Sequence, residues 1–369
     1  MKYMIDEKQS TPAYLQLYTQ IRKDITDGVY VFGSKLPSKR IVATETGIST
    51  ITVEHAYDLL RDEGYIEPKE RSGYFVVFCS DDGFVPVPQK TFDIFSQTSH
   101  NLENDDEFPF SVLAKTMRKV IGMMGEGILV RSPNSGCIEL RKAIQIYLAQ
   151  SRGIVADVDQ IVIGSGSEYL YNLIIDLLGR NLTYGIEYPS YKKIEQVYSL
   201  SKVEIQKLPL SQNGIESSAL RNCYADVLHI SPYRSYPSGV TASASKRHEY
   251  LKWAEKEERY IIEDDFESEF SVSKKPEETL FCHSSKDNVI YMNTFSKTIS
   301  SSLRVGYMVL PKKLAKEYEE RLGFYSCTVP TYIQIVLAEL IANGDFERHI
   351  NRVRRKKRKQ LTQNNKQHP

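Results

Sequence analysis

The chain has 369 residues, 41% apolar and 11% aromatic, which is enough for a folded core and excludes a globally disordered protein. Its 48 Lys and Arg nearly cancel its 47 Asp and Glu, so any contact with nucleic acid must be local. The sequence has no apolar run of about 20 residues, no apolar stretch at the N-terminus and only five scattered cysteines. We therefore expect a soluble cytoplasmic protein of two or three domains, without a membrane span, a disulfide framework or a metal site.

Residues 10–78 predict three helices followed by a β-hairpin. In chain order the predicted elements are a helix over 14–25, a helix after Ser38, a turn at 47–49, a helix from Thr50 to Gly64, and a hairpin with strands at 65–67 and 74–77. This is the plan of a winged helix-turn-helix domain.

Several side chains of this domain are candidates for contact with DNA. The helix that follows the turn can enter the major groove with its first residues toward base edges or phosphates. Basic residues of the preceding helix and of the hairpin turn can bind the phosphate backbone. The candidate DNA-binding residues are Lys39, Arg40, Ser49, Thr50, Thr52 and Arg71. Residues 1–78 carry 10 basic and 11 acidic residues, so phosphate contacts are few and a dimer is expected. Protein contact through the same fold is the alternative.

Residues 79–110 contain three prolines and a polar stretch and show no persistent period, which is typical of an interdomain linker. One short strand is predicted at 91–95. At the other end of the chain, residues 346–369 hold nine basic residues and one Glu, a net charge of +8. This run has two interpretations, a nucleic-acid-binding arm or a solvated face of a helix.

From residue 111 to residue 345, helices alternate with short apolar strands, the pattern of an α/β domain. Strands are predicted at 160–163, 227–230, 260–263 and 289–292. A Gly/Ser turn at 164–167 follows the first strand and opens a helix, an arrangement that can bind phosphate through backbone N–H groups and hydroxyls.

Lys297 lies just beyond the last of these strands, between two hydroxyl residues, with Arg304 seven residues on. A lysine amine held away from water can form a Schiff base with an aldehyde cofactor, while the arginine and the hydroxyls bind its phosphate. An acidic residue at a neighbouring strand end would pair with a pyridinium nitrogen. Each of these signals alone is weak, because Gly/Ser turns and Ser-Lys-Thr tripeptides are common.

Residues 10–77 resemble a GntR-type DNA-binding domain. The resemblance is carried by the segments 12–17, 33–40 and 47–49 and by Thr52-Val53, Ala56-Tyr57, Leu60 and Glu63-Gly64-Tyr65. The family commonly has Arg after the Ser of the turn, where this chain has Thr50.

The rest of the chain resembles the fold-type I aminotransferases, and a GntR head on such a domain is the layout of MocR-type regulators. The matching segments are 164–167, 188–191, 231–239, 263–266 and 294–297 with Arg304. The resemblance implies pyridoxal 5′-phosphate (PLP) as cofactor, bound as a Schiff base on Lys297, and a dimer-interface site. The cofactor-binding residues it implies are Gly166, Ser167, Tyr191, Asp264, Thr294, Ser296, Lys297 and Arg304.

Two departures from the family affect these expectations. Phe266 stands where the family usually has a Tyr that bonds the cofactor's 3′-oxygen. The family also has a small C-terminal domain with a carboxylate-binding Arg, and here the chain ends at Pro369, which predicts a truncated small domain.

The sequence thus predicts a homodimeric transcriptional regulator that binds an operator in double-stranded DNA and senses an amine, an amino acid or PLP itself. The alternatives are an aminotransferase with an accessory DNA-binding head and a cofactor-free DNA-binding remnant. The sequence leaves open whether the domain also acts as an enzyme.

Overall fold

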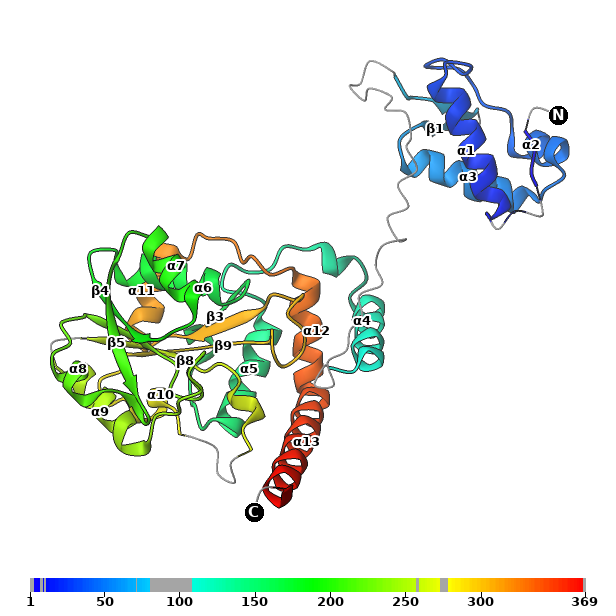
Figure 1. Ribbon diagram of the computed structural model, residues 1–369. Helices are drawn as coiled ribbons and strands as arrows, with labels where there is room; N and C mark the ends of the chain where they lie inside the picture. The colour runs from blue at the N-terminus through cyan, green and yellow to red at the C-terminus, as the bar shows by residue number, and fades with distance from the viewer. Residues whose placement is uncertain are drawn as a thin grey trace. The chain divides into compact units, whose positions relative to one another are not determined.

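The computed structural model describes residues 3–6, 9, 11–70, 72–79, 108–256, 259–272 and 278–367. The chain divides into two compact units, Met1–Asn101 and Leu102–Pro369 (Figure 1). Most of the predicted linker and the strand predicted at 91–95 lie outside the described residues, as does Arg71.

In its described residues, the N-terminal unit contains three helices and a two-stranded hairpin. Its elements are α1 (Ala13–Thr26), α2 (Lys39–Thr46), α3 (Thr50–Asp62), β1 (Ile66–Lys69) and β2 (Gly73–Val76). Helix α1 packs on α3, and Leu17, Ile21 and Tyr57 are almost fully buried between the elements. The predicted winged helix-turn-helix is confirmed.

The turn between α2 and α3 follows from two local signals. Gly47 adopts a positive φ of 77°, which a side chain would disfavour, and so ends α2. The Ser49 hydroxyl then accepts a hydrogen bond from the Thr52 backbone N–H at 3.1 Å and caps α3. Glycine and serine at these two positions therefore set where α3 begins.

The large unit is an α/β domain. Its helices are α4 (Phe110–Met124), α5 (Ile138–Ser151), α6 (Ser167–Leu178), α7 (Lys192–Leu200), α8 (Ser217–Arg221), α9 (Ala244–Ala254), α10 (Leu280–His283), α11 (Lys312–Leu322), α12 (Thr331–Ala342) and α13 (Asp345–Gln367). Its strands are β3 (Ile161–Gly164), β4 (Thr183–Tyr188), β5 (Glu204–Ser211), β6 (Gly214–Ile215), β7 (Val227–Ile230), β8 (Tyr260–Asp264), β9 (Val289–Thr294) and β10 (Gly306–Val309).

The eight strands form one sheet in the order β3-β10-β9-β8-β7-β4-β5-β6. The neighbours from β9 through to β5 are parallel, whereas β10 runs antiparallel to both β3 and β9. Because β3 and the parallel strands end at the same edge, the turns that follow them converge there, which is where α/β sheets bind ligands.

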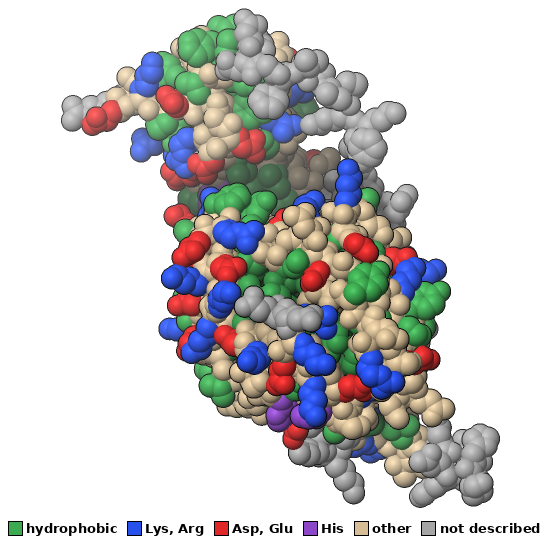
Figure 2. Space-filling model, turned by 90° about the vertical axis from the view of Figure 1, so that its left-hand side faces the viewer, with side chains coloured by type: hydrophobic (Ala, Val, Ile, Leu, Met, Phe, Trp, Pro, Cys, Tyr) green, Lys and Arg blue, Asp and Glu red, His purple; other side chains and the backbone are tan. Residues whose placement is uncertain are grey.

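Both faces of the sheet are covered by helices (Figure 1). Strand residues alternate between two cores: Ile161, Ile163 and Tyr291 pack with α4, α5, α12 and α13, while Val162 and Met292 pack with α6, α7 and α11. Near-continuous apolar strands are what a sheet buried on both faces requires. On the face shown in Figure 2, Lys and Arg side chains are interspersed with Asp and Glu over the large unit.

The basic C-terminal run lies on α13. Phe346, Ile350 and Val353 bury one side of this helix in the core shared with α12. The Arg354 Nε also donates a hydrogen bond to the Glu269 carbonyl at 2.5 Å. These contacts fit the helix-face interpretation of the run.

Trp253, the single tryptophan of the chain, lies on α9 and is 6% exposed. It belongs to a third core with Leu228, Ile261 and Leu280, and the Arg259 guanidinium lies 4.8 Å from its ring. Among the residues that the structure describes, no helix is both long and apolar enough to cross a membrane.

Candidate functional site

A pocket of about 510 Å³ lies at the edge where the parallel strands end, within the range for small-molecule sites. Of the eight predicted cofactor residues, seven line it: Ser167, Tyr191, Asp264, Thr294, Ser296, Lys297 and Arg304. Three lining residues, Arg234, Glu267 and Arg304, have positive φ angles of 50°, 63° and 50°. Such backbone conformations in non-glycine residues cluster at functional sites.

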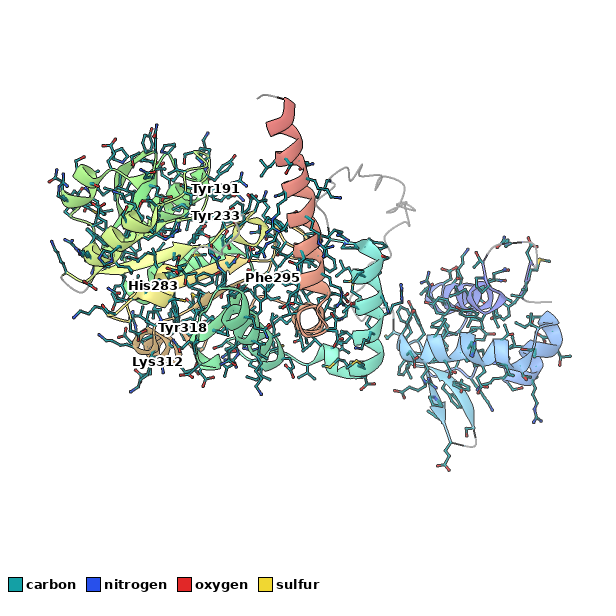
Figure 3. All side chains as sticks on the ribbon, turned by 90° about the horizontal axis from the view of Figure 1, so that it is seen from below. Tyr191, Tyr233, His283, Phe295, Lys312 and Tyr318 are labelled. Atoms are coloured by element: carbon teal, nitrogen blue, oxygen red, sulfur yellow. The ribbon has the colours of Figure 1, made fainter. Side chains whose placement is uncertain are left out.

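The segment after β9 turns Lys297 into the pocket. Thr294 and Ser296 line the pocket and their hydroxyls are 2.9 Å apart. Phe295 between them is buried on the other side, against Tyr307 and Phe346, and is labelled beside α12 and α13 in Figure 3. Strand β9 ends at Thr294 and the chain turns over residues 295–299, so Thr294, Ser296 and Lys297 all line the pocket.

The Lys297 amine has two neighbours in the pocket. It lies 3.3 Å from a Glu267 carboxylate oxygen and 5.5 Å from the centre of the Phe266 ring. Its side chain is 53% exposed, which contradicts the expectation that the amine is held away from water. Phe266 stands where the family usually has a Tyr, and its ring lies beneath the Lys297 amine as a cation–π partner.

The Gly/Ser turn after β3 forms a cradle with Arg304. Gly166 has a φ of +92°, and a Cβ there would lie 2.9 Å from the Arg304 guanidinium. Ser167 begins α6 at this point, so the backbone N–H groups of the first turn face the same space as the arginine. This set of donors suits a phosphate group.

Two adjacent carboxylates at the end of β8 face opposite ways. Asp265 is buried against the Arg152 guanidinium at 2.5 Å and the Tyr291 hydroxyl at 2.6 Å. Asp264 lines the pocket instead. Of the pair, Asp264 is therefore the carboxylate that can meet a ligand.

Asp264 is held by its neighbours. It accepts a hydrogen bond from the Tyr171 hydroxyl at 2.6 Å, and His229 Nε2 lies 3.6 Å away. Burial and the adjacent carboxylate raise the pKa of Tyr171 well above its ordinary value, so this phenol keeps its proton and donates. The Tyr198 hydroxyl, 2.7 Å from His229 Nδ1, in turn positions the imidazole.

Aromatic side chains form the outer wall of the pocket. Tyr191 directly precedes α7, and its ring meets that of Tyr236 edge-on at 6.0 Å. Figure 3 labels Tyr191 and shows Tyr233, from the loop after β7, close by in that view. This wall gives a planar ring a surface on which to stack.

Glu187, near the end of β4, is a buried carboxyl group that also lines the pocket. It accepts hydrogen bonds from the Ser235 hydroxyl at 2.5 Å and the Ser231 N–H at 3.2 Å. Burial outweighs these hydrogen bonds and raises its pKa from 4.5 to about 7.

Replacing Glu187 by Gln is expected to change how stability depends on pH. Because the folded protein holds this proton more tightly than the unfolded chain, Glu187 contributes stability below its ordinary pKa of 4.5, and that contribution is lost as pH rises toward 7. As the pH rises from about 5 to about 7, the unfolding free energy of the large unit should therefore fall less steeply in E187Q than in the unmodified protein, with slopes that differ by about 1.4 kcal/mol per pH unit. Urea unfolding across this range measures it, with E195Q as a surface control; parallel curves for E187Q and the unmodified protein would contradict it.

Several residues of the pocket were not predicted. They are Glu168, Tyr171, Glu187, His229, Arg234, Tyr236 and Glu267. For Glu168 a signal existed, since it directly follows the Gly/Ser turn. The sequence around His229 carries no such signal, and only the fold shows that this histidine neighbours Asp264.

The candidate DNA-binding residues of the head differ in how available they are. Arg40 and Thr50 are exposed. The Lys39 amine is 2.6 Å from Glu54 and 5.2 Å from the Tyr74 ring, so it already has partners within the head. Ser49 and Thr52 bond each other at 2.8 Å as part of the cap of α3.

Comparisons with known proteins match both units. Residues 13–76 match the family of bacterial regulatory proteins, gntR family, and residues 98–368 match aminotransferase class I and II. The uncharacterized HTH-type transcriptional regulator YdeL of Bacillus subtilis is 33% identical, over 94% of this chain and 77% of its own length. The probable rhizopine catabolism regulatory protein MocR of Rhizobium meliloti is 25% identical, over 95% of this chain and 76% of its own.

The fold of the large unit also matches solved structures. A kynurenine aminotransferase from Pyrococcus horikoshii aligns with a TM-score of 0.60 at 24% identity, covering 67% of this chain and 64% of its own. The predicted fold-type I aminotransferase-like domain is confirmed by this likeness and by the family match.

Proposed function

Because this chain belongs to the MocR-type GntR transcriptional regulators, we propose that PLP binds covalently to Lys297 and that ligands at this site alter DNA binding by the head. The chain is a DNA-binding transcriptional regulator with an aminotransferase-like domain, and the aminotransferase family typically binds PLP. The observation that carries the proposal is the convergence of Lys297, Asp264 and Arg304 on one pocket.

Each part of the cofactor has a counterpart among the lining residues. Arg304, the turn at Gly166 and the hydroxyls of Thr294 and Ser296 would hold the phosphate, and Asp264 the ring nitrogen. The ring would stack on Tyr191. When bound, the cofactor supplies an aldehyde that captures amines.

The chain's own residues then orient the ligand. Tyr171 and His229 hold the Asp264 carboxylate toward the pocket, and Glu267 holds the Lys297 amine above Phe266. An amine effector that displaces Lys297 changes the charge and contacts at the rim, and this difference can shift the balance between two states of the protein.

We extend the proposal to assembly and place of action. A homodimer suits two DNA half-sites and the interface location that the aminotransferase resemblance implies. A regulator of chromosomal genes acts where that DNA lies, in the cytoplasm. Sedimentation of the protein with and without DNA tests the dimer.

The test of the proposed function is direct labelling. Full-length protein is mixed with PLP, its visible absorption is recorded, the sample is reduced with borohydride and the modified peptide is mapped. DNA binding is measured with duplexes selected by the protein from a random library, with and without PLP and added amines. Label on Lys297 together with a ligand-dependent change in DNA affinity supports the proposal, and a folded protein without label contradicts it.

Within the head, replacing Arg40 is expected to weaken DNA binding more than replacing Lys39. Arg40 is exposed, whereas Lys39 is paired with Glu54 and its side chain is only 25% exposed. R40A should lower the salt slope of log K by about 0.9, the loss of one phosphate contact. Titrations of the selected duplex at several salt concentrations measure it, and an equal effect of K39A would contradict the distinction.

A further inference from the structure

The phosphate cradle contains a carboxylate of its own. Glu168 lies in the first turn of α6, one residue after Ser167, and lines the same pocket as Arg304. One of its oxygens accepts a short hydrogen bond from the Arg304 Nη2, and the other lies 2.5 Å from the Lys193 amine. Both oxygens are thus engaged by cations.

This carboxylate is charged at every pH at which the protein would be studied. Partial burial opposes its ionisation, but hydrogen bonds from Lys193 and Arg304 lower its pKa to about 2. Its side chain is 23% exposed, so the two ion pairs are only partly screened by water.

Glu168 holds the cation that a phosphate needs. The Arg304 guanidinium lies so close to Gly166 that a Cβ there would be 2.9 Å from it, which leaves little space on the side of the turn. An incoming phosphate must take the donors of Arg304 that Glu168 now occupies, and the two anions repel each other if both remain.

We propose that Glu168 is an internal anion at the phosphate position. Its ion pair with Arg304 must break before a phosphate group binds, and this requirement lowers the affinity of the site for phosphate. The inference rests on the proposed function, since it takes PLP as the ligand whose phosphate enters the cradle. Glu168 is then a specificity-determining residue, because the free-energy cost of breaking its ion pair with Arg304 applies only to ligands that carry a phosphate.

The experiment compares full-length E168Q with E195Q. Gln keeps the size of Glu and one acceptor oxygen, but it removes the charge and replaces the other oxygen by an NH2 donor. Glu195 lies on α7, 2.6 Å from Lys207, and is an ion-paired glutamate that does not line the pocket. The probes are PLP, pyridoxal without a phosphate, and inorganic phosphate as competitor, all followed by visible absorption.

E168Q is expected to bind PLP about tenfold more tightly than the unmodified protein, because the negative charge that competes with the phosphate for Arg304 is removed. Pyridoxal affinity should stay the same, and inorganic phosphate should compete at about tenfold lower concentration. E195Q should behave as the unmodified protein. Equal PLP affinities in E168Q and E195Q, or an equal gain for pyridoxal, would overturn the inference.

Failure of the proposed function gives a different result. If PLP labels Lys297 in neither variant, the cofactor proposal is contradicted. Inorganic phosphate still tests the cradle in that case, because an anion that binds the folded state raises its unfolding temperature. A phosphate-dependent rise that begins at lower concentration in E168Q supports the role of Glu168, and identical rises refute it.

Discussion

Replacing Lys297 by Ala is expected to abolish the borohydride-stable attachment of PLP. Among the described residues, Lys297 is the one lysine that lines the pocket together with Asp264 and Arg304, while Lys193 is ion-paired with Glu168 and is not a lining residue. Stability should change by less than about 1 kcal/mol, because the side chain is half exposed and its ion pair with Glu267 is a surface one. Peptide mapping after reduction measures the first effect and urea unfolding the second.

The control for this variant addresses unspecific labelling of surface lysines. Lys207 is a comparably exposed amine, 2.6 Å from Glu195, outside the pocket. K207A should retain the full label. Substantial borohydride-stable label elsewhere in K297A, at the PLP concentration that saturates the unmodified protein, would mean that Lys297 is not the specific site.

Replacing Arg152 by Met is expected to destabilise the large unit by about 3–5 kcal/mol, because it leaves the Asp265 carboxylate buried without its cation. The Arg152 and Asp265 side chains are 9% and 3% exposed and their atoms approach to 2.5 Å. Asp265 is also next to Asp264, so the loss should reach the pocket. Urea unfolding of the full chain, followed in the large unit, measures the change.

Two further variants distinguish the buried pair from ion pairs in general. R180M removes an arginine that is 59% exposed, lies just beyond the end of α6 and is paired with Asp176 on that helix, and should cost less than about 1 kcal/mol. The double variant R152M/D265N should lose less stability than the sum of its single variants, with a coupling of about 1–3 kcal/mol. Simple additivity would show that the pair does not act as a unit.

Local signals explain how far the fold was predictable. Ser38, Gly47 and Ser49 act through hydrogen bonds and backbone angles of their immediate neighbours, so the helices of the head were predicted to within a residue or two. In the large unit, short apolar runs indicated β3, β7, β8 and β9 because a sheet buried on both faces needs them.

The site was predictable where it depends on strand ends and not where it depends on partners. The positions of Asp264, Lys297 and Arg304 follow from the strands that precede or follow them. The engagement of Arg304 by Glu168, of Lys297 by Glu267 and of Asp265 by Arg152 joins residues 30 to 136 positions apart. No local pattern encodes such pairs, since they form only when the sheet brings the segments together.

The position of Trp253 makes the chain its own optical probe. The only indole belongs to the core beneath α9, against the Arg259 guanidinium, and the N-terminal unit has none. Tryptophan fluorescence therefore follows the melting of the large unit alone, whereas circular dichroism sums the helices of both units. The difference between the two curves separates the transitions of the two units in an intact, unlabelled polypeptide.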